Sequence, residues 1–407
     1  MLNLYHSSSV LVAAVLFLIA TAAASASRPV YSVTNYGSRA DPKTDSTTAF
    51  LDAWSRACSD PRPSTVYVPN GKFYIRNATF EGPCRSNDTL VRVDGTLVAP
   101  ADYSVIGDAG NWILFHSVDG VRISGGILDG QGIALWSCKL HGQKKDCPLG
   151  ATQNLHISNS NNVAIDGLTS TNSQMFHIAI TGCRNVNLQR VTVTAPGSSP
   201  NTDGIHVGLS TLVSITNSTI STGDDCISMG PGARNVWIER VACGPGHGIS
   251  IGSLGWTYQE PGVENVTVKT VNLTETTNGL RIKTWGRPSS GFVRDVLFQH
   301  AVMEGVQNPI LIDQNYCPGN RNCPGRASGV EVSDVRYWNV RGTSRTEVAV
   351  RIDCSKANPC SGIQMRDVAL AYVGSGSGSA SMEAAAASCT NARGTSLTYV
   401  TPVVKCS

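Results

Sequence analysis

Three acidic residues and one histidine recur at a fixed interval in the middle of the sequence. Asp203, Asp225 and His247 follow one another at intervals of 22 residues, and Asp224 directly precedes Asp225. Asp203, Asp225 and His247 each stand two positions before a pair of apolar residues, so the interval is the length of a repeating unit. If the units stack as coils of a solenoid, equivalent positions of neighbouring coils lie about 4.8 Å apart. The spacing therefore predicts that these four side chains form one cluster.

Two cations belong to the same predicted site. Arg281 and Lys283 flank Ile282, and strand alternation sends both outward on one face. Carboxylates beside cations suit hydrolysis of a glycosidic bond in an anionic sugar, where one acid protonates the leaving oxygen and another carboxylate activates water. Crowding raises the pKa of at least one carboxyl, which can then remain protonated as the acid. Three glycines at equivalent positions near Lys283 predict a groove floor without side chains, with tight turns as the alternative explanation: Gly208, Gly230 and Gly252.

Two ladders of apolar pairs must position this cluster. The first ladder consists of Val163/Ile165, Val186/Leu188, Val213/Ile215 and Val236/Ile238. The second consists of Ile178/Ile180, Ile205/Val207, Ile227/Met229, Ile249/Ile251, Leu280/Ile282 and Ile310/Ile312. Ladders in register imply stacked parallel sheets, so we predict an all-β right-handed parallel β-helix. A helical spacing of apolar residues over 45–58 predicts an amphipathic helix that plugs the first coil.

The ends and composition of the chain indicate a secreted protein. An apolar run over residues 10–24 precedes a small-residue cleavage site, so we predict a signal peptide at 1–26 and one domain at 27–407. Thirteen cysteines then favour disulfides. The predicted pairs are Cys58–Cys84, Cys138–Cys147, Cys226–Cys243, Cys317–Cys323, Cys354–Cys360 and Cys389–Cys406, which leaves Cys183 as a buried free thiol. Five sequons permit glycosylation.

The net charge argues against several partners. At +3 it is too weak to indicate nucleic-acid binding, and no basic-aromatic tract supports such a function. No second long apolar segment follows the signal, so we expect no membrane span in the mature protein. The charge is compatible with an acidic polymer bound at a locally positive cleft.

Four motifs in this order resemble the polygalacturonases, the pectin-hydrolysing glycoside hydrolases of family twenty-eight. They are Asn201-Thr-Asp-Gly-Ile-His, Gly223-Asp-Asp-Cys-Ile-Ser, Cys243-Gly-Pro-Gly-His-Gly-Ile-Ser-Ile-Gly and Arg281-Ile-Lys. The likeness covers nearly the whole mature chain. It implies a secreted enzyme of the plant cell wall that acts as a monomer on pectin, with inversion at the anomeric carbon and without metal or cofactor.

The resemblance also assigns roles to the site residues. It implies that Asp224 is the general acid, that Asp203 and Asp225 hold the attacking water, and that His247 orients or tunes the acid. Arg281 and Lys283 are implied to bind galacturonate carboxylates, Tyr316 to contact substrate, and Asn201 to support the water-binding side. Strand alternation would turn Asp203 inward with Ile205, so the family fold implies a bend between them.

Two other functions are compatible with parts of this sequence pattern. A pectate lyase shares the fold and substrate class, but it needs calcium and a strong base, and the adjacent Arg281 and Lys283 argue against it. A catalytically inactive wall-binding protein is a third alternative, which the intact acid row disfavours. Within the hydrolases, the stretch from Glu260 and the run from Arg281 to Trp285 look more like plant pollen-type exopolygalacturonases than endo-acting enzymes. We therefore expect exo action, with endo action as the alternative.

Overall fold

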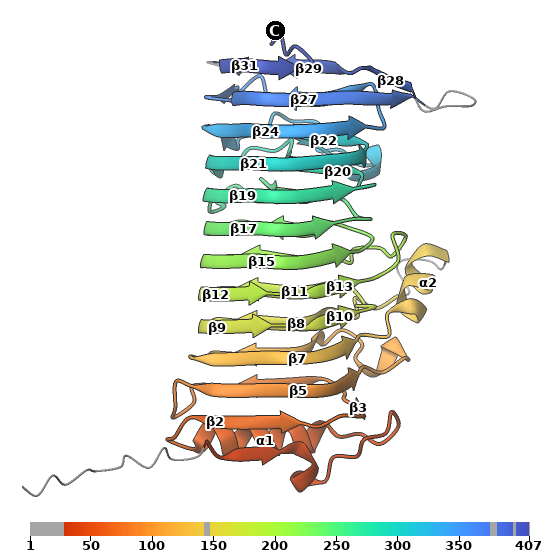
Figure 1. Ribbon diagram of the computed structural model, residues 1–407, viewed down its shortest axis with the longest axis vertical. Helices are drawn as coiled ribbons and strands as arrows, with labels where there is room; N and C mark the ends of the chain where they lie inside the picture. The colour runs from red at the N-terminus through yellow and green to blue at the C-terminus, as the bar shows by residue number, and fades with distance from the viewer. Residues whose placement is uncertain (1–27, 142–146, 375–380, 394–395, 407) are drawn as a thin grey trace, which may run out of the picture.

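The chain forms one column of stacked coils (Figure 1). The structure is a computed structural model that describes residues 28–141, 147–374, 381–393 and 396–406. The predicted signal peptide at 1–26 lies outside the described residues. The coils run from the N-terminal helix at one end to the C-terminal strands at the other, and the predicted right-handed parallel β-helix is confirmed.

Within the described residues, the strands form two large sheets and one short pair. The first sheet contains β1 (Val30–Ser32), β2 (Ser64–Val68), β3 (Lys72–Tyr74), β5 (Thr89–Val98), β7 (Val121–Asp129), β9 (Asn161–Asp166), β10 (Thr169–Thr171), β12 (Arg184–Gln189), β13 (Thr192–Thr194), β15 (Thr211–Ser221), β17 (Arg234–Cys243), β19 (Val263–Thr274), β21 (Phe292–Val306), β23 (Glu331–Val332), β24 (Val335–Ser344), β27 (Gln364–Gly374), β28 (Ser381–Ala384) and β31 (Ser396–Thr401). The second sheet contains β4 (Ala78–Glu81), β6 (Gly110–His116), β8 (Ala151–Ser158), β11 (Phe176–Thr181), β14 (Ile205–Gly208), β16 (Ile227–Met229), β18 (Ile249–Leu254), β20 (Asn278–Trp285), β22 (Asn308–Tyr316), β25 (Val348–Asp353) and β29 (Ala386–Thr390). The short pair is β26 (Cys360–Ser361) with β30 (Ala392–Arg393).

Both apolar ladders stand in the predicted register. In the first sheet Val186 pairs with Val163 and Val213, and in the second sheet Ile205 pairs with Ile178 and Ile227. The paired side chains point into the column and are almost completely buried. Alternation of buried β-branched residues with polar ones gives each strand one inner and one outer face. Outer-face residues of neighbouring coils therefore lie side by side, which is the arrangement that the acid row needs.

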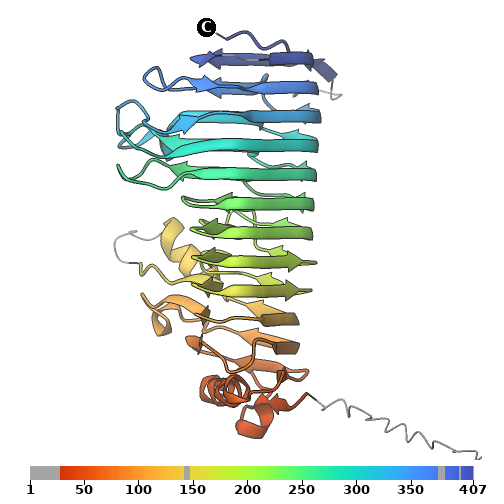
Figure 2. The same cartoon turned by 90° about the vertical axis from the view of Figure 1, so that its left-hand side faces the viewer.

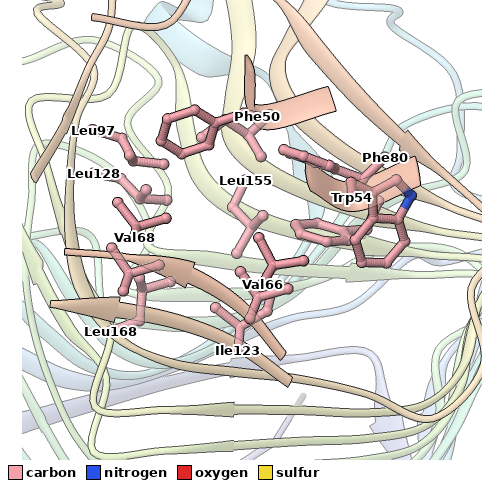
Figure 3. A pocket seen from close by; sticks show the side chains of 14 residues that line it. Phe50, Trp54, Val66, Val68, Phe80, Leu97, Ile123, Leu128, Leu155 and Leu168 are labelled. Atoms are coloured by element: carbon pink, nitrogen blue, oxygen red, sulfur yellow. The ribbon is translucent and has the colours of Figure 1, made fainter. Parts of the chain in front are cut away.

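The N-terminal end of the column is closed by α1 (Thr47–Ser59). Its apolar face buries Phe50 and Trp54, as the helical spacing predicted. The Trp54 ring lies edge-on to Phe80 and Phe115, and its indole nitrogen donates to the backbone oxygen of Glu81 at 2.9 Å. Figure 3 shows Trp54 and Phe80 among the side chains that line an apolar cavity. The volume of this cavity is about 30 Å³. The cavity belongs to the core beneath the cap, because apolar side chains alone line it.

Two groups of segments project from the same side of the column (Figures 1 and 2). The first is α2 (Ile133–His141), which lies beside the coils of β10 and β13. The second group consists of the loops that follow β18, β20 and β22, including the short 3-10 turn η4 (Pro318–Asn320); two other 3-10 turns are η1 (Val33–Tyr36) and η2 (Tyr103–Val105). Among the described residues, no helix has the length and apolarity needed to cross a bilayer.

Six disulfides join the cysteine pairs that the sequence predicts. Cys226–Cys243 bridges the beginning and end of one coil, directly beside Asp225. The others are Cys58–Cys84, Cys138–Cys147, Cys317–Cys323, Cys354–Cys360 and Cys389–Cys406. Cys183 is free and buried, also as predicted.

Candidate active site

Asp203 and Asp225 lie at the amino ends of β14 and β16, where the chain bends before it enters the strand. The bends fall at Gly204 and Cys226, between each acid and the apolar pair that follows it. They turn the carboxylates to the outer face, where Ser228 Oγ donates to Asp203 Oδ2 at 2.7 Å. The structure thus contains the bend that the resemblance implied. Gly204 is required there because a Cβ would lie 2.5 Å from the backbone oxygen of Cys226.

Asp225 is the charge centre of the site. Its Oδ1 accepts from Arg281 Nη2 at 2.6 Å and its Oδ2 from Lys283 Nζ at 2.8 Å. Ser250 Oγ also donates to Oδ1 at 2.8 Å and itself accepts from Arg281 Nε at 2.9 Å. The Asp225 side chain is only 1% exposed, so these contacts satisfy a buried charge. The two cations that the sequence assigns to substrate are therefore bound to an acid in the free protein.

Asp224 and His247 form the more accessible part of the cluster. The His247 Nδ1 atom lies 3.0 Å from Asp224 Oδ1, and the two side chains are 39% and 19% exposed. The Asp225 amide also donates to Asp224 Oδ1, at 2.8 Å. One ligand atom from each of Asp224, Asp225 and His247 lies within 4.8 Å of the other two. The fold therefore brings together the residues that the 22-residue spacing singles out.

Burial and neighbouring charges shift the pKa values of Asp203 and Asp225 in opposite directions. Burial raises the pKa of Asp203 well above its ordinary value, and the neighbouring Asp224 and Asp225 raise it further. Burial also acts to raise the pKa of Asp225, but Lys283 and Arg281 outweigh it and the pKa is lowered. One crowded carboxyl thus has a raised pKa, as the sequence predicts. That carboxyl is Asp203, to which the resemblance assigns the attacking water. Lys283 offsets part of the rise in the pKa of Asp203, but the direct ion pairs of Arg281 and Lys283 are both with Asp225.

Sequence reasoning missed a polar chain behind Asp203. His206 Nδ1 lies 2.8 Å from Ser228 Oγ, which in turn donates to Asp203. The His206 ring stacks on Phe176 with centroids 5.1 Å apart, and burial lowers its pKa to about 4. Ser250 plays the equivalent part for Asp225. The signal was available, because His206, Ser228 and Ser250 each stand between two buried residues of a ladder pair and so must point outward.

The remaining predicted residues lie around this cluster. Tyr316 contacts the cationic side, with Lys283 Nζ 5.2 Å from the centroid of its ring. Asn201 is exposed in a left-handed turn with φ of 57°, and among the described contacts none joins its side chain to the acids. A turn role accounts for its conformation, since Asn tolerates positive φ.

Glycine is needed for different reasons at the three positions of the predicted groove floor. A Cβ on Gly208 would meet nothing closer than 3.5 Å, whereas one on Gly230 would lie 3.1 Å from the His206 ring. Gly252 has a φ of +105°, and its Cβ would lie 2.1 Å from the backbone oxygen of Lys283. Gly208 and Gly230 therefore leave open space around His206, while Gly252 is required by a turn.

The cluster also contains groups that could hold a cation. Asp224, Asp225 and His247 offer two carboxylates and an imidazole at ligand spacing. Both oxygens of Asp225 already accept from cationic side chains, however, and a divalent ion there would face Arg281 and Lys283 directly. The two cations beside Asp225 therefore fit an anionic ligand better than a metal ion.

The parallel β-helix thus carries carboxylates and paired cations together on one outer face. The sequence pattern of the Glycosyl hydrolases family 28 matches residues 58–396, and the chain belongs to this family. It is 57% identical to a polygalacturonase of Prunus persica over 95% of this chain and 96% of that protein. It is 41% identical to an exopolygalacturonase of Platanus acerifolia, with coverage of 93% and 98%. Among solved structures, an exopolygalacturonase of Thermotoga maritima superposes with a TM-score of 0.70 at 19% identity, covering 84% of this chain and 88% of that one.

Proposed function

We propose that the protein hydrolyses the α-1,4-galacturonosyl bonds of de-esterified pectin, with inversion and from the chain end. The observation that supports this function is the pairing of Arg281 and Lys283 with Asp225, within reach of Asp224 and His247. A site for an anionic sugar needs cations beside the acids. The relatives named above as polygalacturonases support the same substrate class.

In this proposal Asp224 is the acid that protonates the leaving oxygen. It is the most exposed of the three carboxyls, with its side chain 19% exposed against 1% for Asp225, so it is the one that a glycosidic oxygen can approach. The neighbouring His247 holds its Oδ1 at hydrogen-bond distance. A positioned acid requires this kind of fixed geometry.

Asp203 and Asp225 hold the attacking water between them. With its raised pKa, Asp203 can keep its proton and donate to the water, while the ionised Asp225 accepts the water's proton. Ionic pairing makes Asp225 a weak base in the free protein. A galacturonate carboxylate would share Arg281 and Lys283, which have five and three N–H donors, and so would return basicity to Asp225. Substrate binding then prepares the base.

Exo action is supported by the residues at the N-terminal end of the acid row. The position equivalent to Asp203 in the preceding coil is occupied by Phe176, because Ile178 pairs with Ile205. Beside it, the Trp136 indole of α2 donates to the backbone oxygen of Ser173 at 3.1 Å. The helix and its Cys138–Cys147 disulfide thus stand at the N-terminal end of the acid row. A polymer could extend only toward the C-terminal coils, so its end would lie at the acids.

Sizing the products of a polygalacturonate digest tests this function. Exo hydrolysis should release galacturonate monomer throughout, and a ladder of oligomers would show endo action. Unsaturated products that appear only with calcium would indicate a pectate lyase, and binding without any product would indicate an inactive wall-binding protein. Proton NMR at early times should show the β-anomer, because inversion converts an α-linkage.

We further propose that the protein is a secreted monomer of the cell wall. Six disulfides support an oxidising compartment. Expression in plant cells should place the protein in the apoplastic fluid, with residue 27 at its mature N-terminus. Retention inside the cell would contradict the localisation, and light scattering at twice the monomer mass would contradict the oligomeric state.

A further inference from the structure

An open groove lies on the C-terminal side of the site, outside the family motifs. Its volume is about 470 Å³, which is within the range of ~300–1,000 Å³ typical of ligand sites. It is formed by the loops that follow β18, β20 and β22. We call it the arginine groove, and its lining residues are Trp256, Tyr258, Arg287, Pro288, Pro324 and Arg326.

A row of aromatic rings connects the arginine groove to the acids. The Trp256 and Trp285 rings lie 4.9 Å apart, and Trp285 lies 5.1 Å from Tyr316. Lys283 Nζ then lies 5.2 Å from the Tyr316 centroid and 2.8 Å from Asp225 Oδ2. The groove is therefore connected to the candidate active site through ring contacts. It lies on the same side of the column as α2 but farther along the axis toward the C-terminal end.

The groove contains two arginines that have no acidic partner in the part of the chain that the structure describes. Among the described residues, no Asp or Glu forms an ion pair with Arg287 or Arg326, whereas Arg234 and Arg294, for example, both pair with Glu264. The Arg287 guanidinium lies 4.0 Å from the centroid of the Trp256 ring, and its Nη1 donates to the backbone oxygen of Trp256 at 3.4 Å. These contacts hold the guanidinium at the groove, and its other N–H donors have no acidic partner among the described residues. Two guanidinium groups without acids are suited to bind carboxylates in a bidentate manner.

The aromatic side chains of the groove are exposed to an unusual degree. Trp256 is 53% exposed and Tyr258 is 69% exposed. Large exposed aromatics beside free cations indicate a binding surface, because neither feature contributes to the core. Flat ring faces suit the apolar faces of sugar rings, while the arginines select sugars that carry a carboxylate.

We propose that the arginine groove is an accessory subsite for a further uronate unit of the same polymer chain. The inference rests on the proposed function, since it takes the polymer cleaved at the acids as its ligand. The closed N-terminal end of the row sends the rest of the chain toward this groove. Arg326 and Arg287 bind the carboxylate of a unit beyond the scissile bond, and Trp256 carries its ring. The subsite gives preference to longer, de-esterified chains.

Kinetics on oligomers of defined length test the subsite. Arg326→Gln and Arg287→Gln should each lower kcat/KM for hexagalacturonate about tenfold, the effect of losing one charge-assisted hydrogen bond, through a higher KM. Digalacturonate spans only the scissile bond, so its kcat/KM should be unchanged in both variants. Arg184→Gln removes an exposed arginine from β12, far from the groove, and serves as the matched control.

The outcomes separate the subsite from the function on which it rests. Unchanged kinetics on hexagalacturonate, or equal losses on dimer and hexamer, would overturn the subsite while leaving a working hydrolase. If the wild-type protein cleaves none of the oligomers, the proposed function itself fails. Arg326 is exposed on a loop, so Arg326→Gln should fold, and an unchanged melting temperature should verify this. Arg326→Lys should restore part of the hexamer preference, because it keeps the charge but loses the fork.

Discussion

At the scale of single residues, the site divides its three carboxyls by environment. Asp224 is accessible and contacts His247, and Asp225 is buried and paired with two cations. Asp203 is also buried but forms no ion pair among the described residues. Three residues of one type can therefore take different parts in one reaction.

Asp224→Asn should abolish turnover while it leaves folding and substrate binding nearly intact. The amide has the same shape but cannot give a proton to the leaving oxygen, so the loss should fall on kcat by about 10²–10⁴-fold. Initial rates and calorimetric binding of an oligogalacturonate would measure the two effects. A variant that retains more than roughly a tenth of the rate would contradict the acid role.

Asp203→Asn should make the protein more stable at neutral pH although it destroys activity. The raised pKa of Asp203 means that its ionised form is less favourable in the folded state than in the unfolded chain. The penalty is therefore absent below the unfolded pKa of about 3.9, and it develops as the pH rises toward the folded pKa. The variant should melt at a higher temperature than wild type at pH 7, with the difference shrinking toward pH 3.5. An equal or lower melting temperature at pH 7 would show that Asp203 carries no such penalty.

Sequence reasoning identified the acids, His247 and the two cations as one site, but not which acid the cations pair with. A constant interval of 22 residues marks Asp203, Asp225 and His247 because stacking converts equal spacing into proximity. Side-chain conformation determines that both cations pair with Asp225. Burial determines that Asp203 is the acid whose pKa is raised. A repeat in the sequence does not encode these quantities, and only the folded geometry supplies them.

At the scale of elements, the two ladders were predictable to the residue because the strand period is 2 and each coil repeats it. The capping helix was predictable from its apolar spacing. The segment around α2 was not, since Trp136 and Leu135 bury against a neighbouring turn that no local pattern reveals. Loop conformation depends on such distant contacts, whereas coil stacking depends on the repeat itself.

Two disulfides close loops of equal length, so comparing them separates an effect on the active site from an effect on the stability of the whole protein. Cys226–Cys243 and Cys389–Cys406 both join residues 17 positions apart. Removing either pair by double Cys→Ala substitution should lower the free energy of unfolding by about 3 kcal/mol, because the closed loops are equally long. Only the first pair adjoins Asp225, so only its removal should lower kcat. Denaturant titration and rate measurements on both variants check this, and equal losses of activity would show that the first disulfide has no special effect on the site.

At the scale of the whole molecule, our proposal of exo action requires that α2 blocks one end of the acid row and that the other end is open toward the C-terminal coils. Replacing residues 131–150 with a short Gly-Ser linker should convert monomer release into a mixture of oligomers, because an internal stretch of polymer could then cross the acid row. Chromatography of early digests measures the product sizes. Trp136→Ala, a milder change that frees the helix from Ser173, should shift the products in the same direction. Release of monomer alone from a folded variant would contradict the blocking role of α2.

The stacking of coils also fixes how this site can change over evolutionary time. Its acids and cations come from successive coils that begin at β14, β16, β18 and β20. Duplication of a whole coil between β14 and β20 would move the acids and cations apart by about 4.8 Å in a single step. Coils added at either end would leave the distances among them unchanged. The separation of the reacting groups is thus a whole number of strand spacings, and gradual change is left to loop length and side-chain identity.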